Sequence, residues 1–321
     1  MATNISISTE YPIEAEDSFD QVTPSIAALA GGGYVAVWGD YTFAQDGSGG
    51  FSGVYGQRYA ADDSKVGDKF TIETFDPAVY SEYVGGNSDA LTPSVIGLSS
   101  GGFVTTWTVQ EEDPYQGWLT TQTYLRVYDA TGTAGQVTAL SNPAISWWEP
   151  ANNNNAVVTA LSNNKFIVIY PGSSVVTDPY GMPMSDEGQL HGAMYLADGV
   201  NVFSGETFTL DIPNASDVLV QAASLADGGF VVTWTSEDQY YGYGRAVYAQ
   251  RFDGSAQKVG DLISVNEAQP SRSMSESEDA SVAGLLNGGF VVVWEASNLQ
   301  GVDDNDGVFA QVFDASGNKV G

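Results

Sequence analysis

Cysteine is absent from this chain of 321 residues, and histidine occurs once, as His191. The lack of thiols excludes disulfide bonds, thiolate metal sites and a cysteine nucleophile. A single histidine also excludes a zinc site built from several imidazoles, and a Ser-His-Asp triad has only His191 to use. Because no nucleophile motif accompanies His191, we expect it to be an ordinary loop residue.

Basic residues are scarce: 10 Lys and Arg stand against 40 Asp and Glu, for a formal net charge of −30. A surface of this charge repels phosphate backbones and anionic lipids, so we expect no nucleic-acid partner. The charged fraction is only 16% and the hydrophobic fraction is 43%, so the chain can bury a core and is not an acidic disordered segment.

Long apolar runs are also lacking. No stretch approaches the ~20 residues that span a bilayer, so we expect no membrane insertion. Residues 1–14 have neither the basic nor the apolar block of a classical signal peptide, and the first basic residue is Arg58. Three options stay open: a cytoplasmic protein, export by a route without such a signal, or a domain of a longer chain.

Glycine and aromatic residues are plentiful, and they mark a repeat. A Gly-Gly-aromatic-Val motif ending in Trp occurs four times, with a degenerate copy, NNKFIVIY, at 163–170. Each copy follows one short apolar segment and precedes a polar loop and further β-branched or aromatic segments, which indicates four short strands per repeat. The marker aromatics, 60 to 69 residues apart, are Tyr34, Phe103, Phe166, Phe230 and Phe290.

The fifth repeat stops at GNKVG, without a fourth apolar segment, whereas NISISTE at 4–10 resembles the fourth segment of other repeats. We therefore predict an all-β five-bladed β-propeller with four antiparallel strands per blade, its ring closed by the N-terminal strand 4–10 completing blade 5. An immunoglobulin-like array needs ~100 residues per unit and a solenoid needs polar caps, so both fit less well. The chain is expected to form one domain, 1–321, with blades at approximately 20–75, 88–142, 149–212, 215–268 and 277–321.

The motif tryptophans are predicted to lie in the core. Within each motif the first aromatic residue and the Trp four positions later share one face of a strand, and they repeat from blade to blade, so packing between blades explains them better than ligand binding does. Gly-Gly supplies the positive φ of a tight hairpin rather than a phosphate loop. These tryptophans are Trp38, Trp107, Trp234 and Trp294.

The loops after the motif are long and rich in acids and aromatics, and with the connections between blades they should share one face of a propeller. Flat rings beside Asp, Asn and Gln suit stacking on sugars, although the same rings can instead fold back as lids over the blades. Catalysis by paired carboxylates, such as Glu111 with Glu112 or Glu237 with Asp238, is disfavoured because adjacent acids are expected by chance among 40. The candidate ligand-binding residues are Tyr115, Trp118, Trp147, Trp148, Tyr240, Tyr241 and Tyr243.

Two of these loops carry acidic clusters that can gather hard oxygen ligands for calcium. DDNDG contributes Asp303, Asp304 and Asp306, and DGSGG contributes Asp46 at the corresponding place in the first repeat. Neither loop has the terminal bidentate Glu of a twelve-residue calcium loop, and Asx-turns explain the same residues equally well. Calcium (Ca2+) is kept as a candidate cofactor.

The composite pattern GGFVV-x-W, a polar loop with DGSG-like residues, GV(Y/F)AQ(R/V)FD(A/G) and then K-V-G resembles repeats of secreted bacterial RTX (haemolysin-type calcium-binding) exoproteins and adhesins. The resemblance covers essentially the whole chain and is clearest in the first, fourth and fifth repeats. It implies an extracellular or cell-surface protein that adheres through a glycan or another surface ligand. We therefore predict a non-catalytic, lectin-like binding propeller; the alternatives are a self-associating subunit of a surface filament or layer, and a five-bladed glycosidase or lyase.

Overall fold

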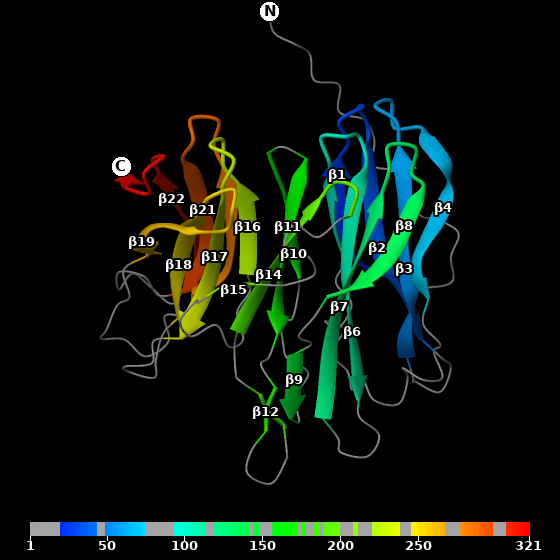
Figure 1. Cartoon of the computed structure of the whole chain (residues 1–321), viewed down its shortest axis with the longest axis horizontal. Coiled ribbons are helices and arrows are strands. Elements are labelled where there is room, and N and C mark those ends of the chain that lie inside the picture. The colour runs from blue at the N-terminus through cyan, green and yellow to red at the C-terminus, as the bar shows by residue number, and fades with distance from the viewer. Residues whose placement is uncertain are drawn as a thin grey trace, which may run out of the picture.

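The computed structural model describes most of the strands and few of the long loops. All regular structure in the described residues is β. Most of it forms five antiparallel sheets, each with four strands in chain order and one with an added fifth strand, which are here called blades 1 to 5 (Figure 1). Five such sheets agree with the predicted five blades. The described residues are 20–43, 49–74, 93–112, 118–140, 144–147, 156–162, 164–172, 175–177, 183–185, 189–199, 208–210, 220–237, 245–266, 277–297 and 306–321.

Blades 1 and 2 have long second and third strands. Blade 1 consists of β1 (Asp20–Ala28), β2 (Tyr34–Phe43), β3 (Gly49–Tyr59) and β4 (Lys65–Thr74). Blade 2 consists of β5 (Ser94–Gly97), β6 (Phe103–Glu112), β7 (Trp118–Tyr128) and β8 (Ala134–Ala139), and a fifth strand, β9 (Ala144–Trp147), also pairs with β7.

Blades 3 to 5 follow the same order. Blade 3 consists of β10 (Val157–Leu161), β11 (Lys165–Gly172), β14 (Gln189–Leu196) and β15 (Phe208–Leu210), and a separate hairpin joins β12 (Val175–Thr177) to β13 (Pro183–Ser185). Blade 4 consists of β16 (Val220–Ser224), β17 (Phe230–Glu237), β18 (Arg245–Phe252) and β19 (Lys258–Ser264). Blade 5 consists of β20 (Ser277–Gly284), β21 (Phe290–Ser297), β22 (Asp306–Phe313) and β23 (Lys319–Val320).

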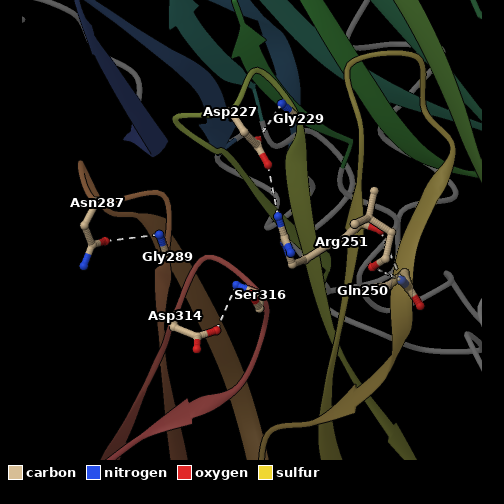
Figure 2. Close-up of polar contacts among 9 residues, drawn as sticks. Asp227, Gly229, Gln250, Arg251, Asn287, Gly289, Asp314 and Ser316 are labelled. Carbon is tan, nitrogen blue, oxygen red and sulfur yellow. Dashed lines mark hydrogen bonds and ion pairs between the residues drawn. The ribbon is translucent and has the colours of Figure 1, made fainter.

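Tight turns join the first and second strands, and their Gly-Gly pairs act as predicted. Gly101 has a φ of +89°, and its N–H donates to the carbonyl of Leu98 at 2.9 Å. At Gly102 a Cβ atom would lie 2.1 Å from the carbonyl oxygen of Tyr128, so no side chain fits there. In blade 4 the turn is braced further, because Asp227 Oδ1 accepts from the N–H of Gly229 at 3.0 Å (Figure 2).

Each blade has two unlike faces, which alternate along its strands. In blade 4 one face carries Phe230 and Trp234 and is called the aromatic face; the opposite, aliphatic face carries Val231, Val247 and Ala249. All five side chains are buried. The aliphatic face of blade 4 packs against the aromatic face of blade 5, while its aromatic face packs against blade 3.

Successive blades therefore share four hydrophobic cores, one at each junction from blade 1 to blade 5. Ring stacking reinforces them: the rings of Phe230 and Phe252 lie 4.9 Å apart within blade 4, and those of Phe290 and Phe313 lie 4.6 Å apart within blade 5. The prediction that the motif tryptophans belong to the core is confirmed, since all four are buried: Trp38, Trp107, Trp234 and Trp294.

Blades 1 and 2 lie towards one end of the long axis and blades 4 and 5 towards the other, with blade 3 between them (Figure 1). The first strands contact one another in the same order, β1 with β5, β5 with β10, β10 with β16, and β16 with β20. Closure of this row into a ring stays a prediction, and residues 4–10 lie outside the described residues. Blade 5 does begin a fourth strand of its own, β23, but with only two residues, Lys319 and Val320.

Candidate functional site

The two ends of each blade differ in the kind of connection that leaves them. At one end, the turn end, tight hairpins join the first strand to the second and the third to the fourth. At the other, the loop end, the second strand finishes and the third begins. The sequence places its acidic and aromatic loops at the loop end, so this end is where a ligand site is expected.

At the loop end of blade 2 the structure describes three paired strands, β6, β7 and β9. β6 and β7 pair along their full length, as far as Glu112 opposite Leu119, and β9 then pairs with the start of β7. In this register Trp118 stands opposite Trp147, and Leu119 opposite Ser146. Two predicted ligand-binding tryptophans, from different loops of the sequence, are thus register partners on neighbouring strands.

Acidic residues lie at the same end of blade 2. Glu111 is opposite Thr120 and Glu112 is opposite Leu119 in the β6–β7 register. The pair of carboxylates that the sequence presents as a chance neighbour pair therefore stands within one or two positions of Trp118 along the sheet. Carboxylates accept hydrogen bonds and aromatic rings offer apolar faces, and such a mixture is typical of sites that bind small polar ligands.

The other predicted ligand-binding residues lie outside the described residues. For blade 4 the structure describes the strands that lead to its aromatic loop, with Glu237 at the end of β17 opposite Arg245 at the start of β18. The structure therefore brings together two of the seven candidates and neither supports nor contradicts the other five, which are Tyr115, Trp148, Tyr240, Tyr241 and Tyr243.

The predicted calcium ligands are likewise mostly outside the described residues. Asp46, Asp303 and Asp304 are not described, whereas Asp306 begins β22 opposite Ser297. Over the described ranges no group of three or more His, Cys, Asp or Glu side chains is placed to hold a metal ion. Calcium binding stays a prediction.

Acidic residues at the turn end have structural partners instead. Asp129 Oδ1 accepts from the N–H groups of Thr131 and Thr133 at 2.8 and 2.9 Å, and the hydrogen bond from the Thr131 hydroxyl is the main reason why the pKa of Asp129 is lowered. Asp314 accepts from Ser316 and Asn318 in the same way, as Figure 2 shows for Ser316, and the backbone of Asn318 is the main cause that lowers its pKa. These Asx-turns stabilise hairpins.

His191 is not a loop residue, contrary to the expectation from sequence. It lies in β14 opposite Tyr170, with the two rings 5.9 Å apart, and it is buried. The same register position holds Tyr124 in blade 2 and Tyr248 in blade 4, each beside a motif tryptophan. His191 therefore substitutes for a core aromatic residue, which the degenerate third repeat concealed. Its burial lowers its pKa, so the neutral imidazole is favoured.

Two arginines join blades, a role that the sequence did not reveal. The guanidinium of Arg58 in blade 1 donates to the carbonyls of Ala130 and Thr131 in the last turn of blade 2. Arg126 in blade 2 donates to the carbonyl of Ile72 in blade 1 at 3.3 Å. The chain has only 10 basic residues, and both arginines lie in the third strand of their repeat. This shared position is the sequence signal that could have indicated a common structural role.

No known protein family matches this chain, and no curated protein does so either. Solved structures with some likeness include a GH93 α-L-arabinofuranosidase of Fusarium graminearum in complex with arabinobiose, at 13% identity and a TM-score of 0.44, over 91% of this chain and 80% of that one. An α-L-arabinanase of Penicillium chrysogenum gives 12% identity and a TM-score of 0.42, over 88% and 79%. A GH43 β-1,3-galactosidase gives 12% identity and a TM-score of 0.42, over 93% and 92%. Likeness at this level assigns no function.

Within the described residues, no helix is long and apolar enough to cross a membrane.

Proposed function

We propose that this chain binds carbohydrate at the loop end of blade 2. The observation that carries the proposal is the register pairing of Trp118 with Trp147, which joins two loops of the sequence at one place on the sheet. Aromatic residues are favoured in ligand sites because they offer a large apolar surface with few rotatable bonds. A sugar ring presents C–H groups to such a surface and hydroxyls to its rim.

A nearby carboxylate supplies the second half of such a site, because Glu111, opposite Thr120, falls on the same face of the sheet as Trp118. Glu111 and Glu112 end β6, next to the start of β7 where Trp118 lies. An ionised carboxylate accepts up to four hydrogen bonds and so suits a ligand rich in hydroxyl donors. The net charge of −30 meanwhile disfavours acidic glycans, so a neutral polysaccharide or cell-surface glycan is the expected class.

Glycoside hydrolysis is a second candidate, and the same carboxylate favours it. Glycosidases commonly use two Asp or Glu residues on either side of the scissile bond. Glu111, opposite Thr120, falls on the face of the sheet that carries Trp118, so it is the candidate for one of these two acids; Glu112 falls on the other face, so the second acid would come from another loop. Binding is the function we put first, and hydrolysis is the outcome that would extend it.

An extracellular or cell-surface place of action is part of the proposal. It rests on the resemblance of the repeat to secreted calcium-binding exoproteins and adhesins. Calcium bound by Asp303, Asp304 and Asp306, with Asp46 in the first repeat, would offset part of the negative charge of the loop end.

The test is a glycan array, followed by titration of the best ligand into the parent chain and into Trp118→Ala and Trp147→Ala. Each substitution should raise the dissociation constant of the glycan about ten-fold, because a stacked aromatic ring contributes ~1–1.5 kcal/mol to binding. Val66→Ala, which removes an exposed side chain at the turn end of blade 1, is the control and should bind like the parent. Unchanged affinity in both tryptophan variants would refute the proposed site.

Hydrolysis is tested on the same ligands by following new reducing ends. Release of sugar by the parent, lost in Glu111→Gln while binding persists, would establish the second candidate. Binding without release in the parent would leave recognition as the function.

A further inference from the structure

Blade 5 exposes a face that every other blade buries. On β22 the exposed residues Val308, Ala310 and Val312 alternate along one face, and Val293 of β21 stands opposite Ala310 on that same face. This is the aliphatic face, which blades 1 to 4 pack against the next blade. Val308 is 77% exposed, whereas Val247 at the same register position of blade 4 is 0% exposed.

Blade 1 exposes part of the complementary face. Ile26 lies opposite Ala36 in β1, on the side of the sheet that carries Trp38, and is 63% exposed. The equivalent residue of blade 2, Val95, is 4% exposed and packs against blade 1. Blade 5 thus leaves its aliphatic face open, whereas blade 1 leaves Ile26 open on an aromatic face whose Ala36 and Trp38 are each only 3% exposed.

The edge of β22 is also incomplete. In the described residues β23 pairs only with Val312 and Phe313 of β22. In blades 1 to 4 the fourth strand continues to a small residue opposite the aromatic residue of the third strand, and the residue after it is a buried aliphatic. These pairs are Tyr55 with Thr71, Tyr124 with Ala139, His191 with Thr209 and Tyr248 with Ser264, and the buried residues that follow are Ile72, Leu140, Leu210 and Val265.

Residues 4–10, which lie outside the described residues, carry the missing pattern. Their sequence, NISISTE, places a small residue, Ser6, directly before an aliphatic one, Ile7. Ile7 precedes the motif aromatic Tyr34 by 27 residues, and the four buried aliphatics precede the next motif aromatic by 20 to 31. The nine residues 11–19 before β1 equal in number the nine between β15 and β16, so the connection is long enough.

We propose that residues 4–10 of this chain complete the fourth strand of blade 5 along the edge of β22, with Ser6 opposite Phe309 and Ile7 beside Val308. The chain then carries blade 1 to blade 5, and the face with Ile26 covers the exposed valines as a fifth junction. The inference does not depend on the proposed carbohydrate site.

An engineered disulfide tests the register directly, because the native chain has no cysteine. In blade 4 the N–H of Val265 donates to the carbonyl of Val247 at 2.9 Å, so the next pair, Tyr248 with Ser264, is a non-hydrogen-bonded pair. Such pairs have Cα atoms about 4.5 Å apart, within the range that a disulfide spans. The variant Ser6→Cys with Phe309→Cys should therefore form a disulfide within one chain under mild oxidation.

The control combines Ser6→Cys with Val312→Cys, because Val312 already pairs with Val320. An intrachain disulfide in the first variant and not in the control, read by intact mass and by migration without reductant, is the expected result. Disulfides between chains, forming ladders that grow with concentration, would overturn the proposal in favour of head-to-tail association of copies. Absence of any disulfide in both variants would overturn it as well.

A second pair of variants tests the same register without cysteines, in case Phe309→Cys disturbs folding. Ile7→Glu puts a charge where blades 1 to 4 bury an aliphatic residue, and it should lower the melting temperature by several degrees. Ser8→Glu adds the same side chain one position later, where blade 1 carries Glu73, and should leave the melting temperature unchanged. Equal melting temperatures for the two variants would contradict the proposed register.

Discussion

Replacing Gly97 with Ala should loosen the junction between blades 1 and 2. Gly97 ends β5, and a Cβ built there lies 2.0 Å from the carbonyl oxygen of Ala28 at the end of β1. A contact shorter than 3.0 Å forces a neighbouring atom to move. The neighbouring atoms here belong to the backbone of Ala28 and Leu29 in blade 1, which cannot turn away as a flexible side chain can. The first strands of the two blades would have to separate by roughly 1 Å, which is the order of displacement that overpacked cores undergo.

The expected cost is about 1–3 kcal/mol, the usual range for overpacking a core. For a chain of 321 residues that lowers the melting temperature by about 1–5 °C, because the unfolding entropy is about 2.1 cal/mol/K per residue. Gly284→Ala should do the same at the junction of blades 4 and 5, because a Cβ there lies 2.0 Å from the carbonyl oxygen of Ser224. Two independent junctions with the same geometry make the effect repeatable within one molecule.

Gly31→Ala is the matched control, because a Cβ at Gly31 has no atom within 4 Å and its φ is not in the left-handed region. Without a clash, Gly to Ala tends to stabilise by ~0.4–1 kcal/mol through the unfolded state. The assay is thermal unfolding followed by circular dichroism. If Gly97→Ala melts within 1 °C of Gly31→Ala, the close approach of β1 and β5 is wrong.

Three further predictions follow from the core and the loops. Trp234→Ala should cost ~3–5 kcal/mol in urea unfolding by opening a cavity between blades 3 and 4, whereas Trp118→Ala at the loop end should cost under 1; equal costs would refute the division between core and site tryptophans. Burial lowers the pKa of His191 below 6.5, so between pH 7 and 5 the unfolded chain takes up a proton that the folded chain does not, and stability falls. His191→Phe should remove that part of the fall, measured as the difference in melting temperature from the parent at each pH; identical profiles would argue against it. Changing Asp303, Asp304 and Asp306 together to Asn should abolish any rise in melting temperature that calcium gives beyond magnesium at equal ionic strength; an undiminished rise would place calcium elsewhere.

The repeat allowed much of the fold to be predicted, because the signals are local. Each motif aromatic lies at or next to the start of a second strand, from Tyr34 in β2 to Phe290 in β21. Even the degenerate copy with Phe166 lies in β11. Gly-Gly turns and period-two alternation act over a few residues, so they survive without knowledge of the neighbours.

The candidate site was harder to predict because it depends on pairing between distant segments. Residues 144–147 read as part of a connection between blades, yet they form β9 against β7 and bring Trp147 opposite Trp118. The hairpin of β12 and β13 was also not predicted, since PGSSVVTDPYGMPMS reads as a polar loop. His191 was misassigned for the same reason, because its aromatic role is visible only once Tyr170 is known to face it.

Burial in this fold is decided by the neighbouring blade more than by the residue itself. The position before the motif tryptophan holds Thr233 in blade 4 and Val293 in blade 5, yet Thr233 is 0% exposed and Val293 is 36% exposed. A polar side chain is covered and an apolar one is open at the same register position, although hydration favours the reverse. The proposed fifth junction would cover Val293 as the four described junctions cover its equivalents. The aromatic face of blade 1, where Ile26 is exposed, has the complementary chemistry and the same register that four junctions already use.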